Sequence, residues 1–183
     1  MYNLQLLCTI WMLASSPDLQ YSDSNNEYAG RIANRITLTA TQKIVACSYM
    51  QEVVIASYEH DVDFWKLLAL IYVESTWTLN AVSPAGACGL TQIIPHYHRD
   101  KHPGLTCEDL INDPRTAIHL TAVIIRQHYE RFNSYARSLE AYNAGQGRVI
   151  RNNVPSETIS YRNKIIAISV FLKRTYRNML RSN

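Results

Sequence analysis

The chain has 183 residues, 47% of them apolar, which is enough for one hydrophobic core and argues against two full-sized domains. Its net charge of +3 is unevenly distributed along the chain. Residues 1–114 carry 6 basic and 12 acidic side chains, whereas residues 115–183 carry 12 basic and 3 acidic ones. The basic part suits a polyanionic partner or is a solvated surface. Since no nucleic-acid-binding motif accompanies the charge, we expect no nucleic-acid partner.

Residues 1–35 are predicted to form an N-terminal segment outside the globular domain. The run from Leu4 to Ala14 is apolar, as in a signal peptide or anchor, but no basic residue precedes Arg31, so its cleavage stays open. The run is too short to span a bilayer. Residues 15–30 are rich in Ser, Asp and Asn, as in a polar linker. The globular domain is therefore expected to cover residues 36–183.

From residue 36 onward the apolar residues follow a helical period. Helices are expected from Ala40 to Tyr58, after the N-cap Asp63, over 114–131 and 135–143, and from Ser156 towards the C-terminus. The last helix is predicted to face inward through Ile159, Ile165, Ile166, Ser169, Leu172, Tyr176 and Met179. Strand signals are limited to a short piece at 90–94. The class is thus mainly α.

Glu74 is the first candidate for chemistry. It follows Leu67 and Ile71 at helical spacing, so it lies on the apolar face of the predicted helix, at its C-terminal end. Burial disfavours a charged carboxylate and raises its pKa towards neutrality, which is what a general acid for glycosidic cleavage needs. The ordinary alternative is a glutamate at a helix end that simply reaches water.

Four short blocks then follow one another along the chain: ES at 74–75, SPAGACGLTQI at 83–93, AYNAG at 141–145 and ETISY at 157–161. Together they resemble the soluble lytic transglycosylases, a family related in fold to goose-type lysozyme, over roughly residues 45–180. The resemblance implies a lysozyme-like single domain with at most a small β element near the cleft. Thr91 and Arg162 depart from the family's usual residues, which leaves the shape of the cleft open.

The resemblance implies that Glu74 is the catalytic acid and then the base. It places six residues in the substrate-binding cleft: Ser83, Gln92, Tyr142, Asn143, Glu157 and Tyr161. For the tyrosines the ordinary alternative is a core aromatic ring. For Gln92 and Asn143 it is hydrogen bonding within a turn.

The number of carboxylates bears on the reaction. Most glycosidases need two, but the other acidic residues considered have no motif context: Asp100, Glu108, Asp109, Asp113 and Glu140. We therefore expect Glu74 alone to cleave the β-1,4 bond between N-acetylmuramic acid and N-acetylglucosamine of peptidoglycan, with formation of a 1,6-anhydro ring. The nearest alternative is a hydrolytic lysozyme on the same fold. A non-catalytic wall-binding or envelope-assembly protein is the alternative from another class.

The four cysteines lack the paired CxxC spacing of zinc fingers. Cys88 and Cys107 bracket an irregular stretch, where a disulfide or two free thiols are both compatible with the sequence. The segment 96–102 holds three histidines, which could bind zinc together with either cysteine or His119, but the spacing fits no finger pattern. We expect no metal and no organic cofactor.

The expected partners are the glycan strands of peptidoglycan and, as a carrier, a virion or an envelope-spanning secretion apparatus. The protein is expected to be a monomer. Its expected location is the periplasm or cell wall, which it would reach by export or by delivery from a virion.

Overall fold

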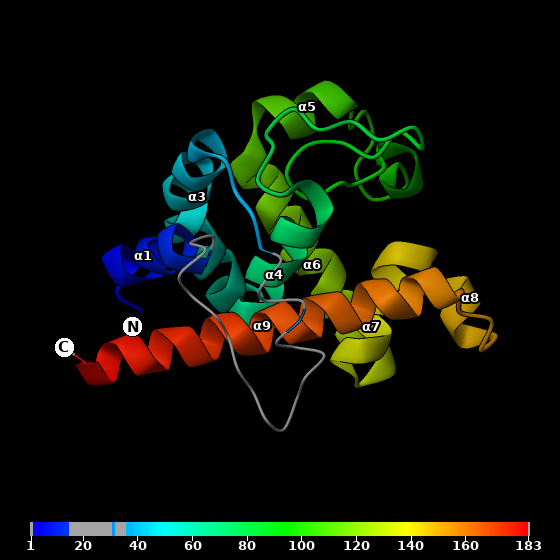
Figure 1. Cartoon of the computed structure of the whole chain (residues 1–183). Helices are drawn as coiled ribbons and strands as arrows, with labels where there is room; N and C mark the ends of the chain where they lie inside the picture. The colour runs from blue at the N-terminus through cyan, green and yellow to red at the C-terminus, as the bar shows by residue number, and fades with distance from the viewer. Residues whose placement is uncertain (1, 15–30, 32–35, 183) are drawn as a thin grey trace.

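The computed structural model describes residues 2–14, 31 and 36–182, and this part of the chain is mainly helical (Figure 1). Its helices are α1 (Leu4–Ala14), α3 (Ala40–Glu59), α4 (Phe64–Ser75), the 3-10 helix η1 (Pro95–His98), α5 (Cys107–Asn112), α6 (Pro114–Phe132), α7 (Tyr135–Ala144), α8 (Gln146–Ile150) and α9 (Ser156–Ser182). The prediction of a mainly α fold is confirmed. The expected linker at 15–30 lies outside the described residues.

The short strand expected at 90–94 does not form as such. In the part of the chain that the structure describes, β structure consists of two isolated antiparallel bridges, from Val82 to Cys88 and from Cys88 to Ile93. Gly89 and Gln92 have φ angles of 69° and 53°, so the backbone turns between them and cannot run as an extended strand. The structure therefore agrees with the expectation of at most a small β element.

Polar side chains set the helix N-termini. The Asp63 carboxylate accepts a hydrogen bond from the Lys66 N–H at 3.0 Å and starts α4. Asp113 accepts one from the Thr116 N–H at 3.1 Å and starts α6, with Pro114 at the first helical position. Both caps are among the sequence predictions, and they fix where the helices that carry the site begin.

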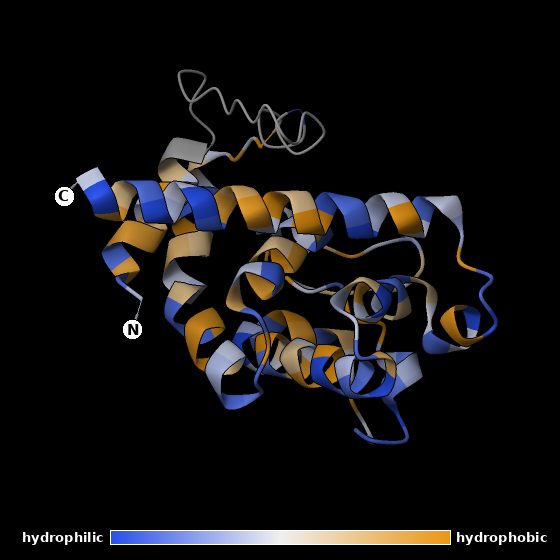
Figure 2. Ribbon diagram, turned by 90° about the horizontal axis from the view of Figure 1, so that it is seen from below, coloured by the Kyte–Doolittle hydropathy of each residue, from blue (hydrophilic) through white to orange (hydrophobic). Residues whose placement is uncertain are grey.

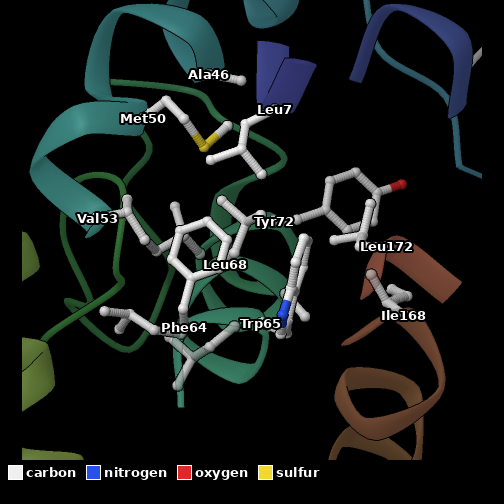
Figure 3. Close-up of a cluster of buried hydrophobic side chains, with 14 of the residues drawn as sticks. Leu7, Ala46, Met50, Val53, Phe64, Trp65, Leu68, Tyr72, Ile168 and Leu172 are labelled. Atoms are coloured by element: carbon white, nitrogen blue, oxygen red, sulfur yellow. The ribbon is translucent and has the colours of Figure 1, made fainter. Parts of the chain in front are cut away.

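Helix α4 lies at the centre of the main core (Figure 3). Five consecutive residues, from Leu67 to Ile71, are each at most 1% exposed, so the helix is covered on all sides. Figure 3 shows α4 side chains such as Leu68 and Tyr72 among side chains from α1, α3 and α9. The residue at the end of this helix, Glu74, is consequently held on a rigid element.

Helix α1 precedes the expected domain start at residue 36, yet it packs in the same core. Leu7, Ile10 and Trp11 are each at most 1% exposed, and the Asn3 N–H donates to the Tyr176 hydroxyl of α9 at 3.0 Å. Figure 1 shows α1 beside α3 and near the C-terminal part of α9. None of the described helices is both long and apolar enough to cross a membrane.

Helix α9 runs along one side of the molecule with alternating apolar and polar patches (Figure 2). Ile165, Leu172 and Tyr176 are buried, as the sequence predicts. Ile159 is 38% exposed, so its predicted inward position is wrong. The inward face begins one residue earlier, at Thr158, which is 1% exposed and lies seven residues before Ile165 on the same helix face.

Candidate active site

Glu74 lies in the last turn of α4, just before Thr76 ends the helix in a left-handed conformation. Its side chain is only partly exposed. Burial raises the pKa of the Glu74 carboxyl from the ordinary 4.5 to about 7, and a hydrogen bond from Tyr161 opposes this rise. The Tyr161 hydroxyl donates to Glu74 Oε1 at 2.5 Å. The carboxyl can therefore carry or release a proton near neutral pH.

Tyr161 and Tyr142 come from α9 and α7 and flank this carboxyl. Burial, followed by the charge of Glu74, raises the pKa of both phenols well above the ordinary value of 10. Both hydroxyls therefore keep their protons at neutral pH. Tyr142 donates to the Thr91 carbonyl at 2.7 Å and lies 3.3 Å from the Thr121 hydroxyl. The two tyrosines thus supply fixed O–H groups near Glu74.

Ser83 and Gln92 lie in the connection between α4 and η1, and the side-chain hydrogen bonds of both residues go to backbone atoms of the same connection. The Ser83 hydroxyl accepts from the Ala87 N–H at 3.0 Å. The Gln92 amide donates to the carbonyls of Ala81 and Gly89, both at 3.0 Å. These bonds hold the connection in shape, and a role in sugar binding stays a prediction.

A disulfide joins this connection to α5. Cys88 and Cys107 are bonded, with their Cα atoms 5.5 Å apart. A Cβ at Gly89 would meet the Leu110 carbonyl oxygen at 2.8 Å, so the connection can pack this closely on α5 only with glycine there. Because both sulfurs are in the disulfide, neither cysteine can join the histidines of 96–102 as a thiolate ligand of a zinc ion.

Asn143 links the AYNAG block to the start of α9, because its side-chain oxygen accepts from the Thr158 hydroxyl at 2.7 Å. Glu157 is exposed in the first turn of α9, and no described hydrogen bond or ion pair connects it with Glu74. The structure thus brings Tyr161 and Tyr142 to Glu74 and leaves Glu157 at the surface. The sequence did not predict that Thr158 and Thr121 would contact site residues. For Thr158 the available signal is its position three residues before Tyr161, which places both on one helix face.

Three further carboxylates have structural partners of their own. Glu140, 7% exposed, forms an ion pair with Arg162, which explains this departure from the family's residues. Asp109 and Asp113 cap α5 and α6. No carboxylate of the described residues contributes to the raised pKa of Glu74. Among the described residues, no hydrogen bond or ion pair brings a second carboxylate to Glu74.

A mainly helical domain whose partly exposed acid, Glu74, is hydrogen-bonded to a tyrosine has the features expected of the lysozyme-like class, and comparison with known proteins identifies the family. The family model described as the Transglycosylase SLT domain matches residues 53–165, which is more than half of the chain. The chain therefore belongs to this family, and the predicted resemblance is confirmed.

Curated relatives include the soluble lytic murein transglycosylases of Escherichia coli strains K12 and O157:H7. Each is 38% identical over 88 residues, an alignment that covers 45% of this chain and 14% of the relative. The match thus spans about a seventh of the length of these relatives.

Solved structures show the same fold. The 70 kDa soluble lytic transglycosylase of Escherichia coli has a TM-score of 0.60 at 24% identity, covering 82% of this chain and 26% of that one. An inactive mutant of the lytic transglycosylase Slt from Pseudomonas aeruginosa scores 0.62 at 21% identity, covering 97% and 31%. A complex of the 70-kDa enzyme with bulgecin A scores 0.62 at 22% identity, covering 98% and 31%.

Proposed function

We propose that this chain is a peptidoglycan lytic transglycosylase that cleaves the β-1,4 bond between N-acetylmuramic acid and N-acetylglucosamine and forms 1,6-anhydro-N-acetylmuramic acid. The observation that carries the proposal is Glu74, whose pKa of about 7 suits both loss and gain of a proton at neutral pH. Membership of the family supports it. So do the curated relatives, which are named murein transglycosylases.

In the first step, protonated Glu74 gives its proton to the glycosidic oxygen as the bond to the anomeric carbon breaks. The substrate's own N-acetyl group stabilises the positive charge at that carbon. The Tyr161 hydroxyl, which donates to Glu74 Oε1, stabilises the carboxylate that this step creates. The acid thus becomes a base without leaving its place.

In the second step, the Glu74 carboxylate takes the proton of the C6 hydroxyl, and the C6 oxygen bonds to the anomeric carbon. The bond to the leaving sugar has been replaced by an internal one, so no water enters the product. Glu74 has regained the proton that it gave. A second carboxylate to activate water is not needed, in agreement with the single acid of the site.

We propose that the glycan contacts Ser83, Gln92, Tyr142, Asn143, Glu157 and Tyr161 as well as Glu74. The charge of Glu74 raises the pKa of Tyr142, so the two side chains are close. The Tyr142 hydroxyl is therefore the first candidate to orient the reacting sugar. The basic residues of 115–183 suit a substrate that carries carboxylates. We propose that the catalytic domain covers residues 36–183, with α1 packed into its core.

We further propose that the protein works as a monomer in the periplasm or cell wall, after export or delivery by a virion or an envelope-spanning secretion apparatus. Peptidoglycan is found in that compartment. The disulfide between Cys88 and Cys107 supports the assignment, because disulfides persist in oxidising environments outside the cytosol.

Release of soluble fragments from purified murein tests the activity. We expect Glu74→Gln to lower the rate at least ~1,000-fold, since acid and base steps each depend on that group. Glu108→Gln is the matched control, because it removes an exposed carboxylate at the start of α5 and should leave the rate unchanged. Equal rates for wild type and Glu74→Gln would contradict the proposal. A wild type that binds murein without releasing fragments would favour the wall-binding alternative.

A further inference from the structure

Two imidazoles and a carboxylate lie together at the surface between α3 and α6. None of the hydrogen bonds of this cluster involves Glu74. Glu59 ends α3, His60 is its C-cap, and His119 lies on α6. His60 Nε2 is 3.1 Å from His119 Nδ1, and Glu59 Oε2 is 3.5 Å from the same nitrogen. The three ligand atoms all lie within 4.8 Å of one another.

These separations are the ones that a small tetrahedral ion requires. Zinc–nitrogen and zinc–oxygen bonds of about 2.0–2.1 Å, at tetrahedral angles, place ligand atoms about 3.3–3.4 Å apart. The observed 3.1 and 3.5 Å bracket that value. The third separation, between Glu59 and His60, is within 4.8 Å, so side-chain shifts of about an ångström would place an ion at bonding distance from all three atoms.

A second carboxylate fixes the orientation of His119. Its other ring nitrogen, Nε2, lies 2.7 Å from Glu52 Oε1, and Glu52 Oε2 is 3.3 Å from Arg115 Nη1. Since a carboxylate accepts from an N–H and the contact with Glu52 is shorter than the one with Glu59, we place the proton of neutral His119 on Nε2, which turns the lone pair of Nδ1 towards His60 and Glu59. A carboxylate behind a ligating histidine is the usual outer arrangement of protein metal sites.

The position of the His60 proton follows from the same contact. Without a metal, His60 donates from Nε2 to His119 Nδ1 across the 3.1 Å contact. When a metal binds, His60 presents the lone pair of Nε2 and carries its proton on Nδ1, which is the other neutral tautomer. No side chain has to lose charge for this change.

We infer that Glu59, His60 and His119 bind a divalent transition-metal ion of the zinc class, with Glu52 orienting His119. Two imidazole nitrogens and one carboxylate favour zinc, cobalt, nickel or copper over magnesium and calcium, which prefer oxygen ligands only. The ion would join the end of α3 to α6 and leave a coordination position for water. These are not the loop histidines of 96–102, and the inference replaces our expectation that no metal binds.

Calorimetric titration of the full chain with zinc chloride, after treatment with a chelator, tests the site. We expect binding of one ion per chain. His60→Gln should remove this binding, and Glu52→Gln, which leaves all three ligands in place, should weaken it roughly 10- to 100-fold. His96→Gln is the matched control, because it removes an exposed histidine of the loop and should leave the affinity unchanged.

Two additional measurements separate loss of the site from loss of the fold. Thermal unfolding without metal should be similar for wild type and Glu59→Gln, whose side chain is exposed, and zinc should raise the melting temperature of the wild type only. Cobalt should give the visible absorption of a tetrahedral ion in the wild type and not in Glu59→Gln. Equal zinc affinity in wild type, His60→Gln and Glu59→Gln, or loss of binding in His96→Gln, would overturn the inference.

Discussion

Replacing Glu74 by Gln should stabilise the protein, and the gain should depend on pH. Burial raises the pKa of Glu74 from the ordinary 4.5 to about 7, so the folded state holds the proton more tightly than the unfolded chain. The favourable contribution of the protonated form is fully present below about pH 4.5 and is lost as the pH rises through about 7. At about 1.4 kcal/mol for each tenfold change in proton affinity, the loss amounts to about 3 kcal/mol.

Gln keeps the shape of the side chain and cannot ionise, so Glu74→Gln should escape this loss. We expect its free energy of unfolding, relative to wild type, to be about 3 kcal/mol higher at about pH 8 than at about pH 4. Urea unfolding followed by circular dichroism across this range measures the difference, with Glu108→Gln as the control for removal of a surface charge. A difference between Glu74→Gln and wild type that does not change with pH would refute the reasoning.

Three further predictions concern the groups around the acid. Tyr161→Phe removes the hydroxyl that lowers the pKa of Glu74, so the pH above which murein cleavage falls should move upward, because the first step needs the protonated acid; an unchanged profile would show that this bond does not act on the acid. Arg162→Met leaves buried Glu140 unpaired and should destabilise the protein by about 3–5 kcal/mol in urea unfolding, with Glu140→Gln in the same chain restoring part of the loss. Reducing the disulfide, which closes a sequence separation of 19 residues, should lower the free energy of unfolding by about 3 kcal/mol, and equal values before and after reduction would contradict this.

The helical framework could be predicted because its signals are local. Asp63 and Asp113 cap their helices as expected, and the period of apolar residues places Glu74 on the face of α4 that becomes buried. Such patterns depend only on neighbours along the chain. The position of the acid and the direction of its pKa shift were therefore accessible before the structure.

The partners of that acid depend on long-range contacts, which local patterns do not contain. Tyr161 reaches Glu74 across 87 positions, and Arg162 pairs with Glu140 across 22. The sequence pointed to Tyr161 only through the family's motif and gave no sign of the ion pair. The burial of α1 was missed for a related reason, because its apolar run also fits an anchor or signal peptide.

His119 shows the same limit for the proposed metal site. From the sequence it could be grouped with the loop histidines of 96–102, whereas packing of α3 on α6 brings it to His60, 59 positions away. Spacing rules detect metal ligands that are close in sequence. Ligands contributed by two separate helices become visible only when the helices are placed.

The central claim is that one acid, acting first as acid and then as base, forms an anhydro sugar. Mass spectrometry of the muropeptides released from purified murein tests it most directly, with Glu74→Gln as the inactive reference. The account predicts products that end in 1,6-anhydro-N-acetylmuramic acid and are lighter by one water than those of a hydrolase. Products with an ordinary reducing end would contradict it and identify a hydrolytic lysozyme instead.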